Sequence, residues 1–304
     1  MKVKIFKSLI IISLAAIFIL PQMVFAVDNA VDKVPAQRLL FPYFQYTLPF
    51  GTDTLIYINN LSWSDSYTVQ ISFFNTTGTA VFNHNAYIEA SATYGFNVRE
   101  LVQLESSDSF FQTSSGTYEG YIVVNVVSSY NSSAYPQVIM GGDDAASGLN
   151  FPSSTKNVLT GSEIIVNVSG QYAGEFKCVN IEATANPHTF EYAATVWVSF
   201  PYLQESQVGA VTSLILWFGS LNPSREISFY LYARDGTYTN STYAVPNAVN
   251  VINLSDLYPG VGSGVYNYGW IDVGESTWTD LLVGQALIVA EGNAFEIVQS
   301  GTNW

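Results

Sequence analysis

Apolar and polar residues alternate along most of this chain with a period of two, the spacing that puts every second side chain on one side of a β-strand. Residues 68–73 (Thr-Val-Gln-Ile-Ser-Phe) and 227–231 (Ile-Ser-Phe-Tyr-Leu) follow this alternation. Apolar runs of strand length occupy 55–58, 121–127, 163–168 and 286–290, and turn residues fill 75–78, 234–236 and 291–293. The helical period is confined to short segments at 98–104 and 254–257, each sufficient for one turn. The sequence therefore predicts an all-β chain, for which sandwiches are the usual architecture.

The same motifs occur twice along the chain, in the same order. Phe41-Pro42-Tyr43 returns as Phe200-Pro201-Tyr202. The other matches pair 69–78 with 227–236, 97–101 with 253–257, 115–118 with 263–266, and 159–166 with 282–289. The separation between paired motifs falls along the chain, as expected when the first copy of a duplicated domain carries insertions. We therefore predict two tandem, internally repeated antiparallel β-sandwich domains.

This repeat sets the predicted limits of the domains. Copy one spans 34–195 and copy two spans 196–304, with a flexible arm at 27–33 ahead of them. The main insertion in copy one is 128–157, a segment rich in Ser, Gly, Asn and Pro. That composition is typical of a long surface loop.

The first 26 residues have the pattern of a secretory signal peptide. Lys2, Lys4 and Lys7 precede an apolar run at 9–20, and Val24-Phe25-Ala26 stands at the expected cleavage position. The apolar run is short for a membrane-spanning helix, which needs about 20 residues. We therefore expect cleavage, export, and a secreted, extracellular or envelope protein with no membrane span once the signal is removed.

The charge balance narrows the range of partners. The chain has 10 Lys and Arg against 24 Asp and Glu, a net charge of −14, and aromatic residues make up 15% of it. Such an acidic chain would be repelled by nucleic-acid phosphates and by anionic lipid surfaces. Its many aromatic and β-branched residues are also unlike those of a disordered chain.

The residues that usually carry chemistry are few. Cys178 is the single cysteine, so no internal disulfide can form, and its apolar surroundings predict a buried, inert thiol. His84 and His188 are expected on solvated loops, outside any zinc-binding or catalytic motif. We therefore predict no catalytic residue, no cofactor and no enzyme activity. Asp143 and Asp144, in the inserted segment, are weak candidates for binding calcium.

Aromatic residues supply the candidate contact positions. Phe229 and its neighbour two residues on belong to one face of a strand, so Tyr230 and Tyr232 point to the other face. A strand that is apolar or aromatic on both faces usually has both of them covered, here by the other domain, another subunit or a ligand. Trp217 and Trp270 are further candidates, because Tyr and Trp suit protein interfaces and sugar stacking alike.

Three segments, 38–44 (Arg-Leu-Leu-Phe-Pro-Tyr-Phe), 53–56 (Asp-Thr-Leu-Ile) and 159–167 (Leu-Thr-Gly-Ser-Glu-Ile-Ile-Val-Asn), give the chain a family likeness. It resembles a loose group of exported bacterial proteins of unassigned function. These proteins open their mature region with an aliphatic-Pro-Tyr-Phe segment and later carry a Thr-Gly-x-x-aliphatic-Val-Asn strand. The resemblance implies an extracellular or envelope β-protein, with no catalytic residues to carry over.

Together these features predict an exported, non-catalytic structural or adhesive protein of the cell surface or extracellular space. It would act through protein–protein contacts with other copies of itself or with surface proteins. The alternative is a carbohydrate-binding module that holds glycans on exposed Tyr and Trp. An outer-membrane β-barrel is a third hypothesis, suggested by the terminal Trp304, but positions 302, 300, 298 and 296 form a poor lipid-facing row.

Overall fold

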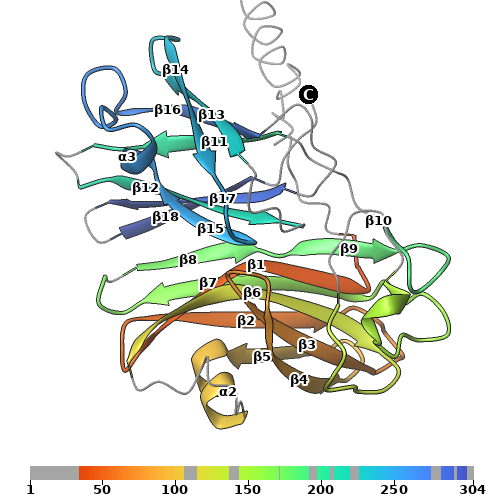
Figure 1. Cartoon of the computed structure of the whole chain (residues 1–304). Coiled ribbons are helices and arrows are strands. Elements are labelled where there is room, and N and C mark those ends of the chain that lie inside the picture. Colours follow the sequence, from red (N-terminus) through yellow and green to blue (C-terminus); the bar gives the residue numbers. More distant parts are fainter. Residues whose placement is uncertain are drawn as a thin grey trace, which may run out of the picture. The chain divides into compact units, whose positions relative to one another are not determined.

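A computed structural model describes residues 34–105, 115–136, 144–170, 172–191, 197–205, 209–219, 226–274, 282–290 and 293–299. The signal peptide predicted at 1–26 and the arm predicted at 27–33 lie outside them, as do most residues around the predicted domain boundary. Strands make up almost all of the described elements (Figure 1). By their contacts, the residues Val31–Trp304 group into a single unit.

The first sandwich pairs a six-stranded sheet, ordered β10-β9-β1-β6-β3-β4, with a four-stranded sheet, ordered β5-β2-β7-β8. All of the strand pairings are antiparallel. The strands are β1 (Arg38–Leu48), β2 (Thr52–Asn60), β3 (Tyr67–Asn75), β4 (Ala80–Ile88), β5 (Thr93–Asn97), β6 (Gly116–Val127), β7 (Leu159–Asn167), β8 (Tyr172–Lys177), β9 (Val179–Ala183) and β10 (Phe190–Glu191).

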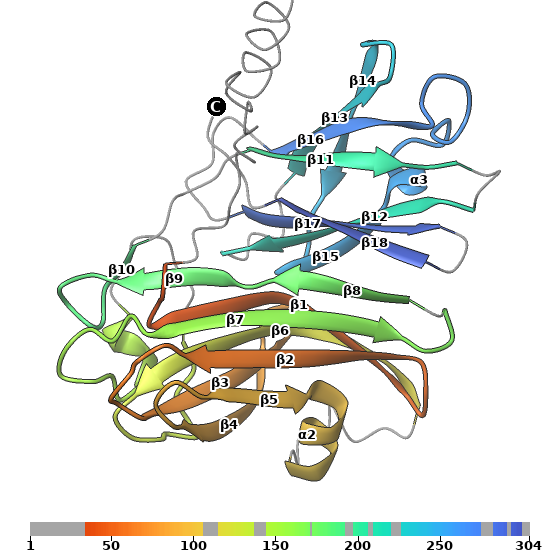
Figure 2. The same ribbon diagram turned by 180° about the vertical axis from the view of Figure 1, so that it is seen from behind.

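The second sandwich pairs two four-stranded sheets, ordered β11-β16-β13-β14 and β15-β12-β17-β18 (Figure 2). Its strands are β11 (Trp197–Leu203), β12 (Val211–Phe218), β13 (Glu226–Ala233), β14 (Tyr238–Ala244), β15 (Val249–Asn253), β16 (Tyr268–Gly274), β17 (Leu282–Ala290) and β18 (Asn293–Gln299). These pairings are antiparallel as well. The predicted all-β sandwich fold is confirmed.

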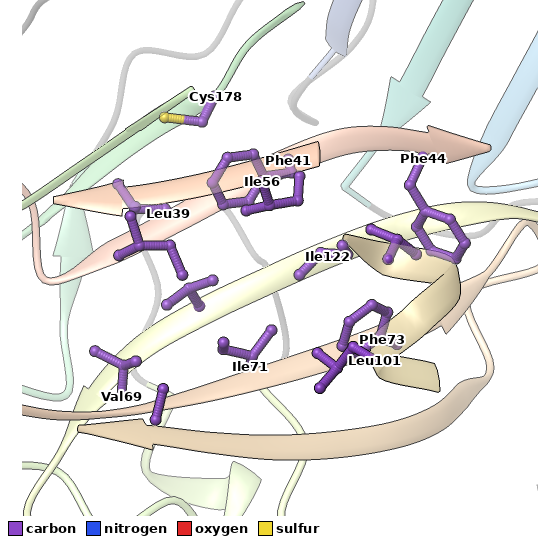
Figure 3. Packing of buried hydrophobic residues seen from close by; sticks show 14 of the residues in the cluster. Leu39, Phe41, Phe44, Ile56, Val69, Ile71, Phe73, Leu101, Ile122 and Cys178 are labelled. Atoms are coloured by element: carbon purple, nitrogen blue, oxygen red, sulfur yellow. The ribbon is translucent and has the colours of Figure 1, made fainter. Parts of the chain in front are cut away.

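The core of each sandwich lies between its two sheets. Phe41, Phe44, Ile71, Phe73 and Ile122 of the first sandwich have no exposed surface (Figure 3). The core of the second sandwich holds a similar set, at most 1% exposed: Phe200, Leu214, Phe229, Leu231 and Ile271. Burying a large apolar side chain stabilises a fold by about 1.5–3 kcal/mol, so these two clusters explain why the alternating pattern forms strands.

The two sandwiches share a strand order. β1-β6-β3-β4 corresponds to β11-β16-β13-β14, and β5-β2-β7-β8 corresponds to β15-β12-β17-β18. The Phe of each Phe-Pro-Tyr motif packs over a glycine of the facing sheet, Phe41 over Gly161 and Phe200 over Gly284, where any side chain would meet the ring. These correspondences support the internal repeat, which stays a prediction.

A pair of threonines adds a further correspondence. The hydroxyl of Thr54 donates to the carbonyl oxygen of Gln45 at 2.8 Å and accepts from its amide at 3.0 Å. Thr212 makes the same two bonds to Leu203, at 2.7 and 3.0 Å. Each hydroxyl therefore satisfies both backbone groups of a strand residue in the opposite sheet.

Two short helices follow β5 and β15. One is α2 (Val98–Glu105), which is longer than the single turn predicted there, and the other is α3 (Leu254–Leu257). The side chain of Asn97 accepts a hydrogen bond from the amide of Glu100 at 2.9 Å, so it caps the first turn of α2. Within the described residues, no helix is both long and apolar enough to cross a membrane.

The described parts of the inserted segment, residues 128–136 and 144–157, pack against the outer face of the larger sheet of the first sandwich. They contain a 3₁₀ helix, Ala145–Ser147, and an isolated bridge between Ser129 and Asn150. Their buried side chains Ala134, Leu149 and Phe151 join a cluster with strand residues such as Leu40, Phe74, Tyr121 and Val123. The described parts of the segment therefore pack against this sheet, in addition to forming the predicted surface loop.

Candidate functional site

The outer face of the sheet β11-β16-β13-β14 brings together three of the predicted contact residues. Because side chains alternate along a strand, the burial of Phe229 and Leu231 puts Tyr230 and Tyr232 on the outer side of β13. The register places Tyr232 between its neighbours Tyr238 of β14 and Trp270 of β16.

Two adjacent rows of residues cross this sheet. The first row is Pro201, Trp270, Tyr232 and Tyr238, and the second row is Ser199, Asp272, Tyr230 and Asn240. We call these eight residues the open face. They include no Val, Leu, Ile or Met, so the face consists of aromatic rings, hydroxyls, one carboxylate, one amide and a proline.

The aromatic rings of the open face are accessible. Trp270 is 49% exposed and Tyr238 is 62% exposed, and Tyr268, next along β16, is 47% exposed. The rings of Tyr232 and Tyr238 lie 5.7 Å apart between centroids and are tilted by 33°. Several large rings therefore offer surface to a partner on one side of one sheet.

Asp272 is the negatively charged group of the open face. Its carboxylate accepts a hydrogen bond from the hydroxyl of Ser199 at 2.6 Å. Burial and the neighbouring Asp272 carboxylate raise the pKa of Tyr232, so its hydroxyl stays a protonated donor at neutral pH. Of the described cations, Arg234 approaches a ring at the edge of this face, with its guanidinium carbon 5.8 Å from the centre of Tyr268.

The matching pair of rings in the first sandwich is covered. Phe74 and Tyr121 are opposite each other on β3 and β6, as Tyr232 and Trp270 are on β13 and β16. The rings of Phe74 and Tyr121 stack at 4.7 Å and are only 5% and 8% exposed. The same place in the fold is thus closed in one sandwich and open in the other.

Trp217 is positioned apart from the other three candidates. It lies on β12, is 1% exposed, and meets the ring of Tyr121 edge-on at 5.6 Å. Its contacts are therefore internal to the chain, and it is not part of the open face.

The carboxylate proposed for calcium has another partner. Asp144 and Arg38 form an ion pair and are both almost fully buried, at 2% and 1% exposed. Arg38 also donates to the side chain of Asn125 at 2.7 Å and lies 3.9 Å from the centre of the Phe190 ring. Asp143 lies outside the described residues, which contain no group of three or more His, Cys, Asp and Glu able to hold a metal ion.

His84 is not on a loop, as the sequence predicted, but within β4. Its Nδ1 lies 2.6 Å from the carboxylate of Glu105, and its Nε2 lies 2.9 Å from the hydroxyl of Tyr94. The imidazole thereby links β4 to β5 and to the end of α2. The prediction of a solvated histidine was wrong. Both partners lie on other elements, and the sequence pattern does not show which elements lie beside β4.

Cys178 is buried as predicted, at 4% exposed. Burial raises the pKa of its thiol to about 12, so the reactive thiolate is scarce at neutral pH.

An open hollow of about 560 Å³ adjoins α2 and is lined by Phe50, Leu104 and Arg99 among others. Arg99 is paired with Asp53 at 2.9 Å, and the hollow has polar lining residues such as Asn97 and Gln103 beside its apolar ones.

Comparison with known proteins identifies no relative from which a function could be carried over. No protein-family model matches the chain, and no curated protein matches its sequence. The solved "Crystal Structure of Thermotoga maritima 1070" has 10% identity and a TM-score of 0.29, over 49% of this chain and 98% of that one. The W96F oxalate decarboxylase of B. subtilis has 10% identity and a TM-score of 0.20, over 86% and 68%. The tandem CBM22 domains of Paenibacillus barcinonensis Xyn10C have 10% identity and a TM-score of 0.16, over 85% and 83%. Likenesses this distant carry no argument about function.

Proposed function

We propose that this chain is an exported, non-catalytic structural or adhesive protein that acts through contacts made at its surface. The observation that carries the proposal is the open face of the second sandwich. Accessible aromatic residues that form a group on a solvent-facing sheet mark an interaction site more often than single exposed aromatic residues do. Tyr and Trp are the residues most enriched in binding hot spots, together with Arg.

The contrast between the two sandwiches supports this proposal. In the first, the stacked rings of Phe74 and Tyr121 are covered by the rest of the chain. In the second, the corresponding rings of Tyr232 and Trp270 keep accessible surface. A partner bound to the open face would cover the rings of the second sandwich, as the chain itself covers the corresponding rings of the first.

The proposal assigns no catalytic step, and three of the described groups with catalytic potential make structural contacts. His84 is bonded to Tyr94 and Glu105, and Asp144 is paired with Arg38. The thiol of Cys178 is buried and its pKa is raised. These contacts are structural, and they favour a protein that binds over one that reacts.

Two assays of the mature chain, residues 27–304, test the proposal. Light scattering after size exclusion, over a wide range of concentrations, detects self-association, and flow cytometry with fluorescently labelled chain detects attachment to the producing cells. We expect at least one assay to be positive, and to be lost in Trp270→Ala. Trp63→Ala, which removes a Trp that is 92% exposed elsewhere, is the matched control. A chain that stays monomeric and does not attach would contradict the proposal.

A further inference from the structure

We propose that the open face binds an uncharged glycan chain, with successive sugar rings stacked on Trp270, Tyr232 and Tyr238. This inference rests on the proposed function and names the chemistry of its partner. Four properties of the face carry it: its composition, the line of its rings, the polar row beside them and its charge.

The composition of the open face fits a sugar better than a protein. The core of a protein interface is apolar and draws on Met and Arg as well as aromatic residues. The eight residues of the open face are rings, hydroxyls, Asn240, Asp272 and Pro201, and the aliphatic Leu203 lies in the adjoining row, opposite Tyr268. A pyranose ring presents C–H groups on its face and hydroxyls at its rim, so it needs both a flat ring to pack against and hydrogen-bonding groups nearby.

The rings form a line of the right kind for a chain of sugars. Trp270, Tyr232 and Tyr238 stand in register on three neighbouring strands, β16, β13 and β14. Adjacent strands are about 4.8 Å apart, so the line extends over roughly 10 Å. Tyr232 and Tyr238 are tilted rather than stacked on each other, so each ring keeps a face for a ligand.

The second row supplies the hydrogen bonds. Asp272, Tyr230 and Asn240 lie two residues along the same three strands, which is about 7 Å from the line of rings. The bond from Ser199 fixes the Asp272 carboxylate in place, while its other lone pairs can accept from sugar hydroxyls. The hydroxyl of Tyr232 is hydrogen-bonded to the Asp272 side chain, so it joins the line of rings to the polar row.

The charge of the face and of the chain selects an uncharged glycan. The face carries the carboxylate of Asp272, and the chain has a net charge of −14. At the edge of the face, the guanidinium carbon of Arg234 lies 5.8 Å from the centre of the Tyr268 ring. A uronate, sulfate or phosphate on the glycan would therefore meet repulsion with little compensation.

Affinity electrophoresis of the mature chain tests the inference. The probes are hydroxyethylcellulose, xylan, mannan and soluble starch, with polygalacturonate as the charged counterpart. We expect at least one uncharged polysaccharide to retard the chain, and polygalacturonate not to. Trp270→Ala and Tyr232→Ala should each weaken binding about ten-fold or more, as substitutions in a binding hot spot do. Trp63→Ala should leave it unchanged, and Tyr232→Phe should keep most of it, because the stacking ring is retained.

Three results would overturn the inference: no retardation by any uncharged probe, stronger retardation by polygalacturonate, or equal binding by Trp270→Ala and the wild-type chain. The fold of each variant is checked by its thermal unfolding curve, since Trp270 is half exposed and its loss should leave the curve unchanged. If no glycan binds but the chain self-associates in a Trp270-dependent way, the face takes a second copy, so this inference fails and the proposed function stands. If the chain binds no probe, does not assemble and does not attach to cells, both fail.

Discussion

The two sandwiches have the same strand order but opposite outer faces. In the first, the larger sheet presents Arg38, Gln70 and Asn125, which are at most 1% exposed because the inserted segment covers them. In the second, the corresponding sheet presents the open face, with Trp270 half exposed. The comparison teaches that the framework of strands does not determine which surface is free. The inserted segment and residues of the second sandwich, Ile215, Trp217 and Val249 among them, together cover the larger sheet of the first sandwich.

The cover and the sheet beneath it depend on each other through polar bonds. The amide group of Gln70 donates to the carbonyl oxygen of Ala134 at 2.7 Å and accepts from the amide of Asn131 at 3.2 Å. Arg38 pairs with Asp144 on the same segment. Buried polar groups of this kind are costly when a partner is lost, so the covered face holds its cover in one position.

The largest effect is expected from breaking the ion pair under the cover. Asp144→Asn leaves the buried guanidinium of Arg38 without its counter-charge, which should lower the free energy of unfolding by about 3–5 kcal/mol. Urea unfolding followed by fluorescence measures this change. The double variant Arg38→Met/Asp144→Leu removes both charges and should recover most of the loss. A drop of less than about 1 kcal/mol in Asp144→Asn would show that the pair does not hold the cover.

A matched pair of substitutions compares the covered and open faces directly. Phe74→Ala empties a site under the cover and should cost about 3–5 kcal/mol of stability. Tyr232→Ala, at the corresponding place on the open face, should cost less than about 1 kcal/mol. Equal losses in the two variants, measured by the same urea titration, would mean that the two faces are equally packed.

Two glycines test whether the cores are built alike. Gly161→Ala and Gly284→Ala would each push a methyl group into the Phe of a Phe-Pro-Tyr motif, at an expected cost of about 1–3 kcal/mol. Gly260→Ala is the control, because a side chain there would meet no other atom within 4 Å. Thermal unfolding should separate both core variants from the control. A marked loss in only one of them would argue against a shared framework.

The smallest effect is a pH dependence from Cys178 of the first sandwich, which begins near pH 9, below the range in which buried tyrosines such as Tyr202 of the second sandwich contribute. Cys178 ionises with a pKa near 9.0 when unfolded, and burial raises the pKa to about 12 in the fold. The group therefore contributes its full stability below pH 9, and that contribution is lost as the pH rises from 9 towards 12, by up to about 1.4 kcal/mol per pH unit. Cys178→Ala should flatten this part of the stability profile measured between pH 8 and 10. An unchanged profile would place the thiol in contact with water.

Much of the fold could be predicted from local pattern. The alternation at 68–73 and 227–231 predicted two strands, and the structure has β3 and β13 at these positions. The helix α2 was predicted too short, although Asn97 and Glu100 stand at the spacing of a capping box, which signals a helix start. The prediction followed the short apolar pattern of this segment and did not use the capping signal.

The candidate site was predictable only in part. Which rings are covered, and which residues lie opposite one another on neighbouring strands, depends on residues that are distant in the sequence. Alternation placed Tyr230 and Tyr232 on one side of β13, but only the register brings Tyr238 and Trp270 beside them. Trp217 and Trp270 look alike in sequence, but Trp217 is buried in a cluster with residues of distant strands, such as Tyr121. Asp144 reads as a solvated loop acid because its partner, Arg38, is 106 positions away.

Oxidative footprinting by mass spectrometry tests the central claim most directly. The mature chain is oxidised by hydroxyl radicals in its free form and in its bound form, whether assembled, attached to cells or mixed with a retarding polysaccharide. The account predicts that oxidation of Trp270 and Tyr238 falls in the bound form, while oxidation of Trp63 does not change. Trp270 oxidised equally in both forms, with protection elsewhere, would show that the contact surface is not the open face.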